Sequence, residues 1–482
     1  MEEGAQVAEG PMEIPYRFAK DSDAGELQAR WRDLPPGEEA HQVATVAGRL
    51  MLIRPQGRMV FATLRDWTGA IQLWGVAGVT EDLESLGRLS LGDWVGATGD
   101  VVRTRRGELS VRVRRWVLLA RARRHFGDKW RGVSDVETRF RQRYVDLWAN
   151  DDPRSILLRR SMMVSLMRRF LEERGFVEVE TPILQVVPSG GHALPFVTHH
   201  NALDADLYLR IAIELHLKRL VVGGMEKVFE IGRIFRNEGL SPRHNPEFTM
   251  LELYQAYADY TDMMALTESM VAHLARECCG SVVIPYEGRE LDLSPPWRRA
   301  TMTELVEEQT GEVVDLAMGR DGLAKVAGRL GVTVEPRWGP GALLFEIYEK
   351  TTEPNLWGPV HVCDYPKEVS PLARDHRSRP GYVERFESIL AGRELANAFS
   401  ELNDPDEQRA RFEDQARQRA AGEEEAMPLD RDYLRAMEYG LPPTGGLGVG
   451  VDRLAMLLTG SRHIREVIAF PAMRPEVWDE AE

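Results

Sequence analysis

The sequence predicts an α+β protein with a small β-barrel near the N-terminus and a larger domain of strands and helices after it. Three observations lead to this fold class. Five short strand-like segments with glycine-rich turns lie within 43–118, a helical pattern follows at 155–174, and strand-like and helical segments then alternate as far as Pro471. Short strands at such regular spacing are typical of a barrel or sandwich. The 482 residues are enough for two or three domains.

The first domain begins after an acidic extension. Residues 1–40 are acidic and contain Pro35-Pro36, so we expect an extension that is poorly ordered at its start. The strand-like segments then fill a domain at 41–125. The interval 41–131 holds sixteen Lys and Arg against eight Asp and Glu, although the whole chain has a net charge of −15. A small basic barrel is typical of an OB-fold that binds nucleic acid. From charge alone, a solvated and charge-rich surface is an equal alternative.

A polar linker is expected at 126–150, followed by the second domain at 151–482. In 155–174, Leu158, Met162, Leu166 and Phe170 recur every four residues, and Gly175 ends the helix that this spacing predicts. Residues 176–180 then alternate like a strand, 259–279 reads as a helix, and 285–350 reads as an insertion of mixed character.

Composition also limits where the protein works. No apolar run reaches the roughly 18 residues that a membrane helix needs, and the acidic N-terminus lacks a signal-peptide pattern. Cys278, Cys279 and Cys363 have no zinc-ligand spacing. We therefore expect packed thiols, a cytoplasmic protein and no membrane partner.

Two arginine motifs carry the chemistry. Arg236 and Glu238 lie two residues apart on an extended segment, so both face the same side of a sheet. A guanidinium can fork onto an α-phosphate, and a carboxylate can accept from an adenine amino group. Phe248 offers a flat ring for a base, and about 200 residues later Arg453 follows a glycine-rich segment that admits a close ligand.

These segments resemble the three motifs of class II aminoacyl-tRNA synthetases, with motif 1 at about 155–182, motif 2 at about 229–254 and motif 3 at about 445–456. The sequences at 198–204, 217–224 and 442–448 make the resemblance more specific, because they are similar to bacterial class II lysyl-tRNA synthetases. The resemblance covers about 41–475. It implies an antiparallel sheet flanked by helices, an OB-fold anticodon-binding domain and a homodimer.

The resemblance also implies a reaction. The lysine carboxylate attacks the α-phosphorus of ATP, pyrophosphate leaves, and the lysyl group of the adenylate passes to tRNA-Lys. The substrate is its own nucleophile, so the protein supplies position and compensating charge. By matching, Arg236 and Arg453 are catalytic, and Glu387 and Glu394 hold Mg²⁺ as oxygen ligands. The implied ATP-binding residues are Arg236, Glu238, His244, Asn245, Phe248, Glu387, Glu394 and Arg453.

The same matching implies a pocket for L-lysine, a substrate with two ammonium groups. Glu214 matches the reader of the α-amino group, whereas Glu401 and Tyr254 match the readers of the ε-ammonium. An uncharged side chain would leave a buried Glu401 unpaired, which is the expected source of selectivity. The implied lysine-binding residues are Gly190, Glu214, Glu252, Tyr254, Asn397 and Glu401.

In the barrel, the resemblance implies that Phe61, Gln72 and Glu108 read a U-rich anticodon. Phe61 can stack on an unpaired base, and Gln72 and Glu108 can form hydrogen bonds with base edges. A buried core phenylalanine is the ordinary alternative for Phe61.

Three substitutions depart from the family pattern. Ala396 and Ala398 stand where the family has glycines, and Leu194 replaces an arginine. Extra methyl groups on a pocket floor would shift or exclude a substrate. One alternative is therefore a paralogue that activates lysine or a lysine analogue for an acceptor other than tRNA. A non-enzymatic RNA-binding relative is a third hypothesis, but it predicts loss of Arg236, Glu387, Glu394 or Arg453, and all four are present.

Overall fold

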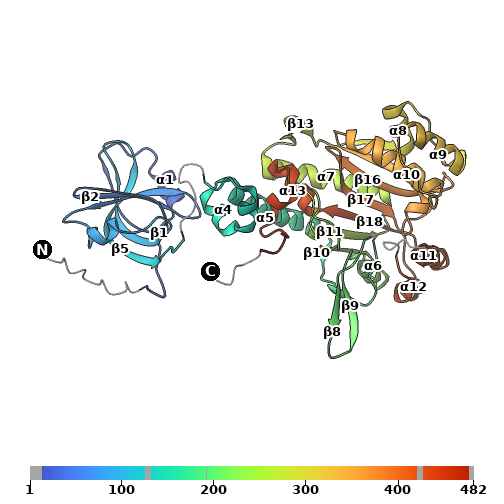
Figure 1. Ribbon diagram of the computed structural model, residues 1–482, viewed down its shortest axis with the longest axis horizontal. Coiled ribbons are helices and arrows are strands. Elements are labelled where there is room, and N and C mark those ends of the chain that lie inside the picture. The colour runs from blue at the N-terminus through green and yellow to red at the C-terminus, as the bar shows by residue number, and fades with distance from the viewer. Residues whose placement is uncertain (1–13, 125–131, 192, 421–426, 477–482) are drawn as a thin grey trace. The chain divides into compact units, whose positions relative to one another are not determined.

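The computed structural model describes residues 14–124, 132–191, 193–420 and 427–476. The chain divides into two compact units, Met1–Arg139 and Phe140–Glu482, each with its own hydrophobic core (Figure 1). We describe each unit by itself. The expected linker falls partly on 125–131, which lies outside the described residues.

The first unit is a closed five-stranded barrel with the strand order β1-β2-β3-β5-β4 (Figure 1). Its strands alternate between buried and exposed residues, as expected when one face of each strand fills the barrel interior. The strands are β1 (Glu39–Gln56), β2 (Met59–Arg65), β3 (Ala70–Val76), β4 (Trp94–Arg103) and β5 (Leu109–Ala120), with the short helix α2 (Leu83–Gly87) after β3. The predicted barrel is confirmed.

Part of the acidic extension belongs to this barrel. Helix α1 (Ala24–Arg30) buries Ala24 and Leu27 in the barrel core. The backbone N–H of Ala24 also donates to the Asp66 carboxylate at 2.8 Å. The expectation of poor order concerned the start of the extension, and residues 1–13 lie outside the described part of the chain.

The second unit is built on an eight-stranded sheet with the order β14-β15-β16-β17-β18-β11-β10-β6. Its neighbouring strands are antiparallel except for β14–β15 and β10–β6, so the predicted fold class is confirmed. The strands of this sheet are β6 (Val177–Glu178), β10 (Lys227–Phe235), β11 (Glu247–Ala256), β14 (Arg298–Thr301), β15 (Val360–Pro366), β16 (Tyr382–Leu390), β17 (Arg393–Ser400) and β18 (Thr444–Gly450). Two small sheets contain β7 (Leu184–Gln185), β8 (Val197–His200), β9 (Ala205–Leu209), β12 (Val283–Tyr286) and β13 (Arg289–Asp292).

One face of the large sheet packs on three helices, α5 (Asp152–Glu172), α7 (Tyr260–Cys279) and α13 (Val451–Thr459). Helix α7 begins where the sequence predicts, because the Asp259 side chain caps its first turn and Gly280 ends it in a left-handed conformation. Helix α3 (Val136–Arg141) spans the division between the two units. This unit also contains α4 (Arg143–Ala149), α6 (Glu214–Val222), α11 (Pro405–Ala420), α12 (Arg431–Glu438) and α14 (Ile464–Val467).

Helix α5 forms as predicted, but its apolar stripe is only half buried. Leu166 and Phe170 pack in the core, whereas Leu158 and Met162 are 51% and 45% exposed. The segment 285–350 has the mixed character that the sequence predicts. It contains α8 (Met302–Thr310), α9 (Gly319–Arg329) and α10 (Pro340–Thr351), with the short 3-10 helices η1 (Leu316–Met318), η2 (Glu353–Asn355) and η3 (Lys367–Val369) nearby. These helices share a second core with β15 and β16.

Candidate active site

A cavity of about 970 Å³ opens on the face of the sheet opposite the α5–α7–α13 layer. It collects residues from 190–214, from motif 2, from motif 3 and from the segments between these motifs. The predicted residues that line it are Gly190, Glu214, Arg236, Glu238, His244, Asn245, Phe248, Glu252, Tyr254, Glu387, Glu394, Asn397 and Arg453. Glu401 is the exception among the predicted lysine-binding residues, because it lies behind the cavity wall.

One end of the cavity gathers arginines beside an aromatic ring. The guanidinium carbon of Arg236 lies 5.3 Å from the centroid of the Phe248 ring. Strands β10 and β11 bring the two residues together, because Ile234 pairs with Phe248 and the Arg236 N–H donates to the Pro246 carbonyl at 2.9 Å. Arg453 reaches the same cavity from α13. A flat ring in a cavity that two cations also line is suited to a nucleotide base and its phosphates.

Two carboxylates face this end from the β16–β17 hairpin. Burial and the neighbouring Glu394 raise the pKa of Glu387 to about 7. Burial opposes ionisation of Glu394 as well, but the guanidinium groups of Arg453, Arg385 and Arg236 together lower the pKa of that carboxyl. Arg453 donates to Glu394 Oε2 at 3.0 Å and to its backbone carbonyl at 2.7 Å. The pair therefore concentrates negative charge that a cation would relieve.

Arg385 also belongs to this group, although no role is predicted for it from the sequence. Its Nη2 donates to Glu387 Oε1 at 2.6 Å, and its Nε donates to Asn397 Oδ1 at 3.0 Å. A signal was present in the sequence, because Arg385 stands two residues before Glu387 on one strand and so shares its face.

His244 and Asn245 line the cavity in different ways. Ser241 Oγ lies 2.9 Å from His244 Nδ1, and burial followed by the nearby Arg453 lowers the pKa of His244. Both polar atoms of the Asn245 side chain bond to backbone groups, because its nitrogen donates to the Glu247 carbonyl and its oxygen accepts from the Ala472 N–H. Asn245 therefore stabilises the loop between β10 and β11, which is the motif 2 loop.

The other end of the cavity is acidic and closed. Glu252 is buried, and its two oxygens accept from the Ile213 N–H at 3.4 Å and from the Tyr254 hydroxyl at 3.1 Å. Burial and the neighbouring Glu214 raise the pKa of Glu252 to about 7. Tyr254, predicted to contact the ε-ammonium, thus donates to Glu252 in this structure.

Two glycines make room for this acidic end. Gly190 has a φ of 90°, and a Cβ there would lie 3.1 Å from the Ala212 Cβ. A Cβ on Gly446 would come within 1.9 Å of Glu401 Oε1 and 2.6 Å of the Tyr254 ring. Gly446 is therefore the thin part of the wall that covers Glu401.

The substitutions that distinguish this chain lie outside the cavity. Strand β17 alternates, so that Asn397 and Phe399 line the cavity while Ala396 and Ala398 are buried in the core opposite it. The expectation that their methyl groups alter the substrate floor is wrong, because the alternation of strand side chains points them at the helices. Leu194 contributes its carbonyl to the Asn237 N–H at 2.8 Å and does not line the cavity.

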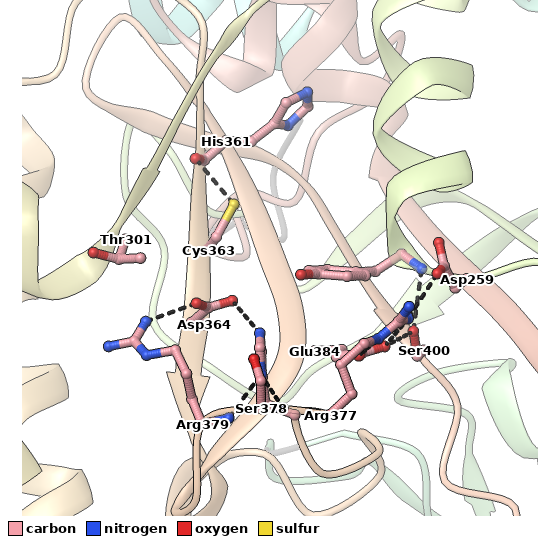
Figure 2. A network of polar contacts seen from close by, with 12 residues as sticks. Asp259, Thr301, His361, Cys363, Asp364, Arg377, Ser378, Arg379, Glu384 and Ser400 are labelled. Atoms are coloured by element: carbon pink, nitrogen blue, oxygen red, sulfur yellow. Dashed lines mark hydrogen bonds and ion pairs between the residues drawn. The ribbon is translucent and has the colours of Figure 1, made fainter.

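A polar network braces the strands beside Glu401. Figure 2 shows the Glu384 carboxylate between Arg377 and Ser400. Ser400 Oγ donates to Glu384 at 2.7 Å and accepts from the Tyr260 N–H, and Arg377 also pairs with Asp259. The network ties the end of β17 to the start of α7. No sequence pattern indicates this network, because its members are far apart along the chain.

In the barrel unit, the three predicted anticodon residues lie near one another on one side. Phe61 pairs with Trp74 across β2 and β3, and the two rings stack with centroids 6.1 Å apart and planes 10° apart. Gln72 Oε1 accepts from Ser110 Oγ at 2.9 Å, and Glu108 is exposed. Phe61 and Trp74 are both partly exposed, so Phe61 is not a core residue. Trp74 was not predicted.

The described residues contain no group of three or more His, Cys, Asp or Glu side chains arranged to hold a metal ion by themselves. None of the described helices is long and apolar enough to cross a membrane. The three cysteines are free thiols, and Cys363 is buried.

Comparisons with known proteins agree with both units. Residues 135–474 match the family model of class II tRNA synthetases (D, K and N), and residues 44–119 match that of the OB-fold nucleic acid binding domain. The chain is 52% identical to a lysine–tRNA ligase of Synechococcus sp. (strain CC9902), over 98% of this chain and 95% of that protein. It is 51% identical to a lysine–tRNA ligase of Prochlorococcus marinus (strain MIT 9313) with the same coverage.

Proposed function

Because the chain belongs to the class II lysine–tRNA ligases, we propose that its cavity joins L-lysine to ATP between two oppositely charged ends and that its barrel reads the anticodon of tRNA-Lys. The single observation that carries the proposal is one cavity with arginines at one end and buried carboxylates at the other. ATP is polyanionic and lysine carries two ammonium groups, so each substrate has a complementary end.

At the arginine end, Arg236 binds the α-phosphate and the lysine carboxylate, while Phe248 and Arg453 enclose the adenine. Glu238 and His244 contact ATP from the motif 2 loop, and Asn245 holds that loop. The lysine carboxylate oxygen bonds to the α-phosphorus as the bond to pyrophosphate breaks. Arg236 and Arg453 stabilise the negative charge that develops there.

Glu387 and Glu394 suit Mg²⁺ in the presence of ATP. Two adjacent carboxylates, of which Glu394 raises the pKa of Glu387, are a fitting pair of hard oxygen ligands, and phosphate oxygens and water would complete the shell. When bound, the ion neutralises phosphate charge and favours the departure of pyrophosphate. Arg385 holds Glu387 and Asn397 in place from beneath.

At the acidic end, Gly190 lets the backbone approach the lysine α-amino group, and Glu214 binds that group. Asn397 contacts the lysine carboxylate. Glu252, Tyr254 and Glu401 form the end of the pocket that takes the ε-ammonium. A substrate without this ammonium leaves buried carboxylates unpaired, which costs binding free energy.

The first experiment measures ATP–pyrophosphate exchange with L-lysine, β-lysine, ornithine and arginine in parallel, followed by transfer of the preferred amino acid to tRNA-Lys. We expect exchange with L-lysine and charging of the tRNA. Exchange with a different amino acid alone would refute the assignment of the acidic end.

Phe61, Gln72 and Glu108 are proposed to bind the anticodon. The partly exposed Phe61 supports this role, because an accessible ring can stack on an unpaired base, worth about 1–3 kcal/mol. Phe61→Ala should raise the KM for tRNA and leave ATP–pyrophosphate exchange unchanged. Trp67→Ala is the matched control, since Trp67 is exposed elsewhere on the barrel. An equal loss of both activities would mean that Phe61 supports the fold.

We also propose a homodimer that works in the cytoplasm, where tRNA is charged. Leu158 and Met162 of α5 are exposed, and so is Val186. Exposed apolar side chains on a motif 1 helix favour coverage by a second copy. Sedimentation of the protein and of a Leu158→Asp variant tests this, and an unchanged mass in the variant, together with a monomeric parent, would refute it.

A further inference from the structure

A lysine of the chain itself lies behind the acidic end of the cavity. Lys218 lies one turn after Glu214 on α6 and is completely buried. Its ammonium lies 2.5 Å from Glu214 Oε1 and is also paired with Glu401. These are the two carboxylates proposed to bind the two ammonium groups of the substrate.

Aromatic rings enclose this ammonium on the remaining sides. The Nζ atom lies 5.3 Å from the centroid of the Phe399 ring and 5.9 Å from those of Tyr254 and Tyr433. Cation–π attraction in a desolvated site favours a fixed ammonium. The chain contains seven lysines and 54 arginines, so a lysine stands at this position although arginine is by far the commoner basic residue of the chain. A planar guanidinium differs in shape from the compact ammonium that this enclosure surrounds.

The charges at this end do not balance without a ligand. Glu214 and Glu401 pair with the Lys218 ammonium, and Glu252 accepts from the Tyr254 hydroxyl beside them. Three carboxylates and one ammonium leave an excess of two negative charges when all are ionised. L-Lysine brings two ammonium groups to this end, which matches that excess.

Lys218 also affects the ionisation and the orientation of the Glu401 carboxyl. Burial raises the pKa of Glu401 well above its ordinary value, and the neighbouring Lys218 ammonium acts in the opposite direction. Lys218 pairs with Oε2, while Oε1 lies against Gly446 and accepts no hydrogen bond in the described part of the chain. The free oxygen therefore points at the thin part of the cavity wall.

We propose that Lys218 is a positioning and specificity-determining residue, whose buried ammonium holds Glu401 ionised and oriented so that the pocket selects an amino acid with a side-chain ammonium. This rests on the proposed lysine pocket. Lys218 contacts the carboxylates and leaves the reacting atoms to other residues. It sets the charge of the pocket by neutralising one of three carboxylates permanently, since burial would lower its pKa but the two paired carboxylates raise it far more.

The test is Lys218→Met, which keeps a side chain of similar length without the charge. We expect the KM for L-lysine in ATP–pyrophosphate exchange to rise on the order of 30-fold or more, as when one partner of a buried charge pair is removed. The KM for ATP should stay within about twofold, and the preference for lysine over norleucine should fall. Lys325→Met is the matched control, because Lys325 is exposed on α9 and does not line the cavity.

Chemical rescue separates charge from packing if Lys218→Met folds poorly. In Lys218→Ala, propylammonium should restore exchange with L-lysine, while 1-propanol, of the same shape and without charge, should not. The same amine should give no gain with the parent protein. Equal rescue by the alcohol, an unchanged KM for L-lysine in a folded variant, or equal rises in both KM values would overturn the proposal.

A failure of the proposed lysine pocket can be distinguished from a failure of the proposed role of Lys218. If the proposed function is wrong, Glu401→Gln and the parent protein will show the same KM for L-lysine. If only the role of Lys218 is wrong, Glu401→Gln will lose lysine affinity while Lys218→Met keeps it.

Discussion

The two ends of the catalytic cavity handle charge in opposite ways. At the nucleotide end, Arg236 and Arg453 line an open space, and each carboxylate there has an arginine beside it. At the amino-acid end three carboxylates are buried, and a single ammonium pairs with two of them. Paired and partly solvated charges tolerate the exchange of ATP for products, whereas buried and unbalanced charges penalise any ligand that fails to neutralise them. The first end is built for charge compensation during reaction and the second for selection.

The largest effect is expected from breaking the nucleotide end. Glu394→Gln removes a proposed Mg²⁺ ligand and the charge that Arg453 pairs with, so kcat for ATP–pyrophosphate exchange should fall about a thousandfold, as expected for several kcal/mol of lost transition-state stabilisation. Thermal unfolding should remain within a few degrees of the parent. Glu346→Gln is the control, since Glu346 lines the same cavity without a proposed role. An exchange rate in the Glu394→Gln variant equal to that of the parent protein would show that Glu394 has no role in the reaction.

Breaking the amino-acid end should act on binding. Glu401→Gln keeps the size of the side chain and removes the charge that Lys218 and the substrate share. The KM for L-lysine should rise on the order of 100-fold while the KM for ATP hardly changes. Steady-state exchange kinetics with each substrate varied in turn measures this split. A rise in the KM for ATP of the same size would show that the two ends are not independent.

The pH dependence sharpens the contrast further. Burial and Glu214 raise the pKa of Glu252 to about 7, so this carboxyl is protonated in the empty pocket below that pH. Its contribution to folding stability is therefore present below its unfolded pKa of about 4.5 and is lost as the pH rises through about 7. Lysine binding needs the ionised form, so the KM for L-lysine should fall by up to about tenfold from about pH 6 to about pH 8. Glu252→Gln should flatten this profile. A KM for L-lysine that does not change between about pH 6 and about pH 8 in the parent protein would contradict this prediction.

The smallest effect tests the boundary of the amino-acid end. Ala398→Gly removes a methyl group from the core face of β17 and adds backbone freedom, so the free energy of unfolding should fall by about 1 kcal/mol. The KM for L-lysine should be unchanged, because Ala398 faces away from the cavity. Denaturant unfolding and exchange kinetics measure the two quantities. A changed preference among lysine, ornithine and β-lysine would mean that the core face does influence the pocket.

The sequence predicted what depends on motifs and local periodicity. The barrel strands, helix α7 and the set of residues around the cavity were all recognisable, because each lies in a short segment with its own pattern. The orientation of Ala396 and Ala398 also follows from the sequence, because side chains alternate along a strand and Asn397 between them is predicted to contact the substrate. An expectation that places all three side chains on one pocket floor is inconsistent with this alternation.

Tertiary pairing was beyond reach of the sequence. Lys218 meets Glu401 across 183 residues of chain, and Arg377 meets Asp259 across 118. No local pattern distinguishes such residues from surface charges. The exposed half of α5 is a different case, because its spacing predicts a buried stripe and a single chain does not supply what covers it.

Lys218 has a consequence for the accuracy of the genetic code. The residue is inserted during translation by the same charged tRNA that this enzyme produces. When another amino acid is attached to tRNA-Lys, a fraction of new enzyme copies receives that amino acid at 218 and loses the ammonium that keeps Glu401 selective. Errors in charging then produce less discriminating enzyme, so fidelity in one generation of protein molecules depends on fidelity in the previous one.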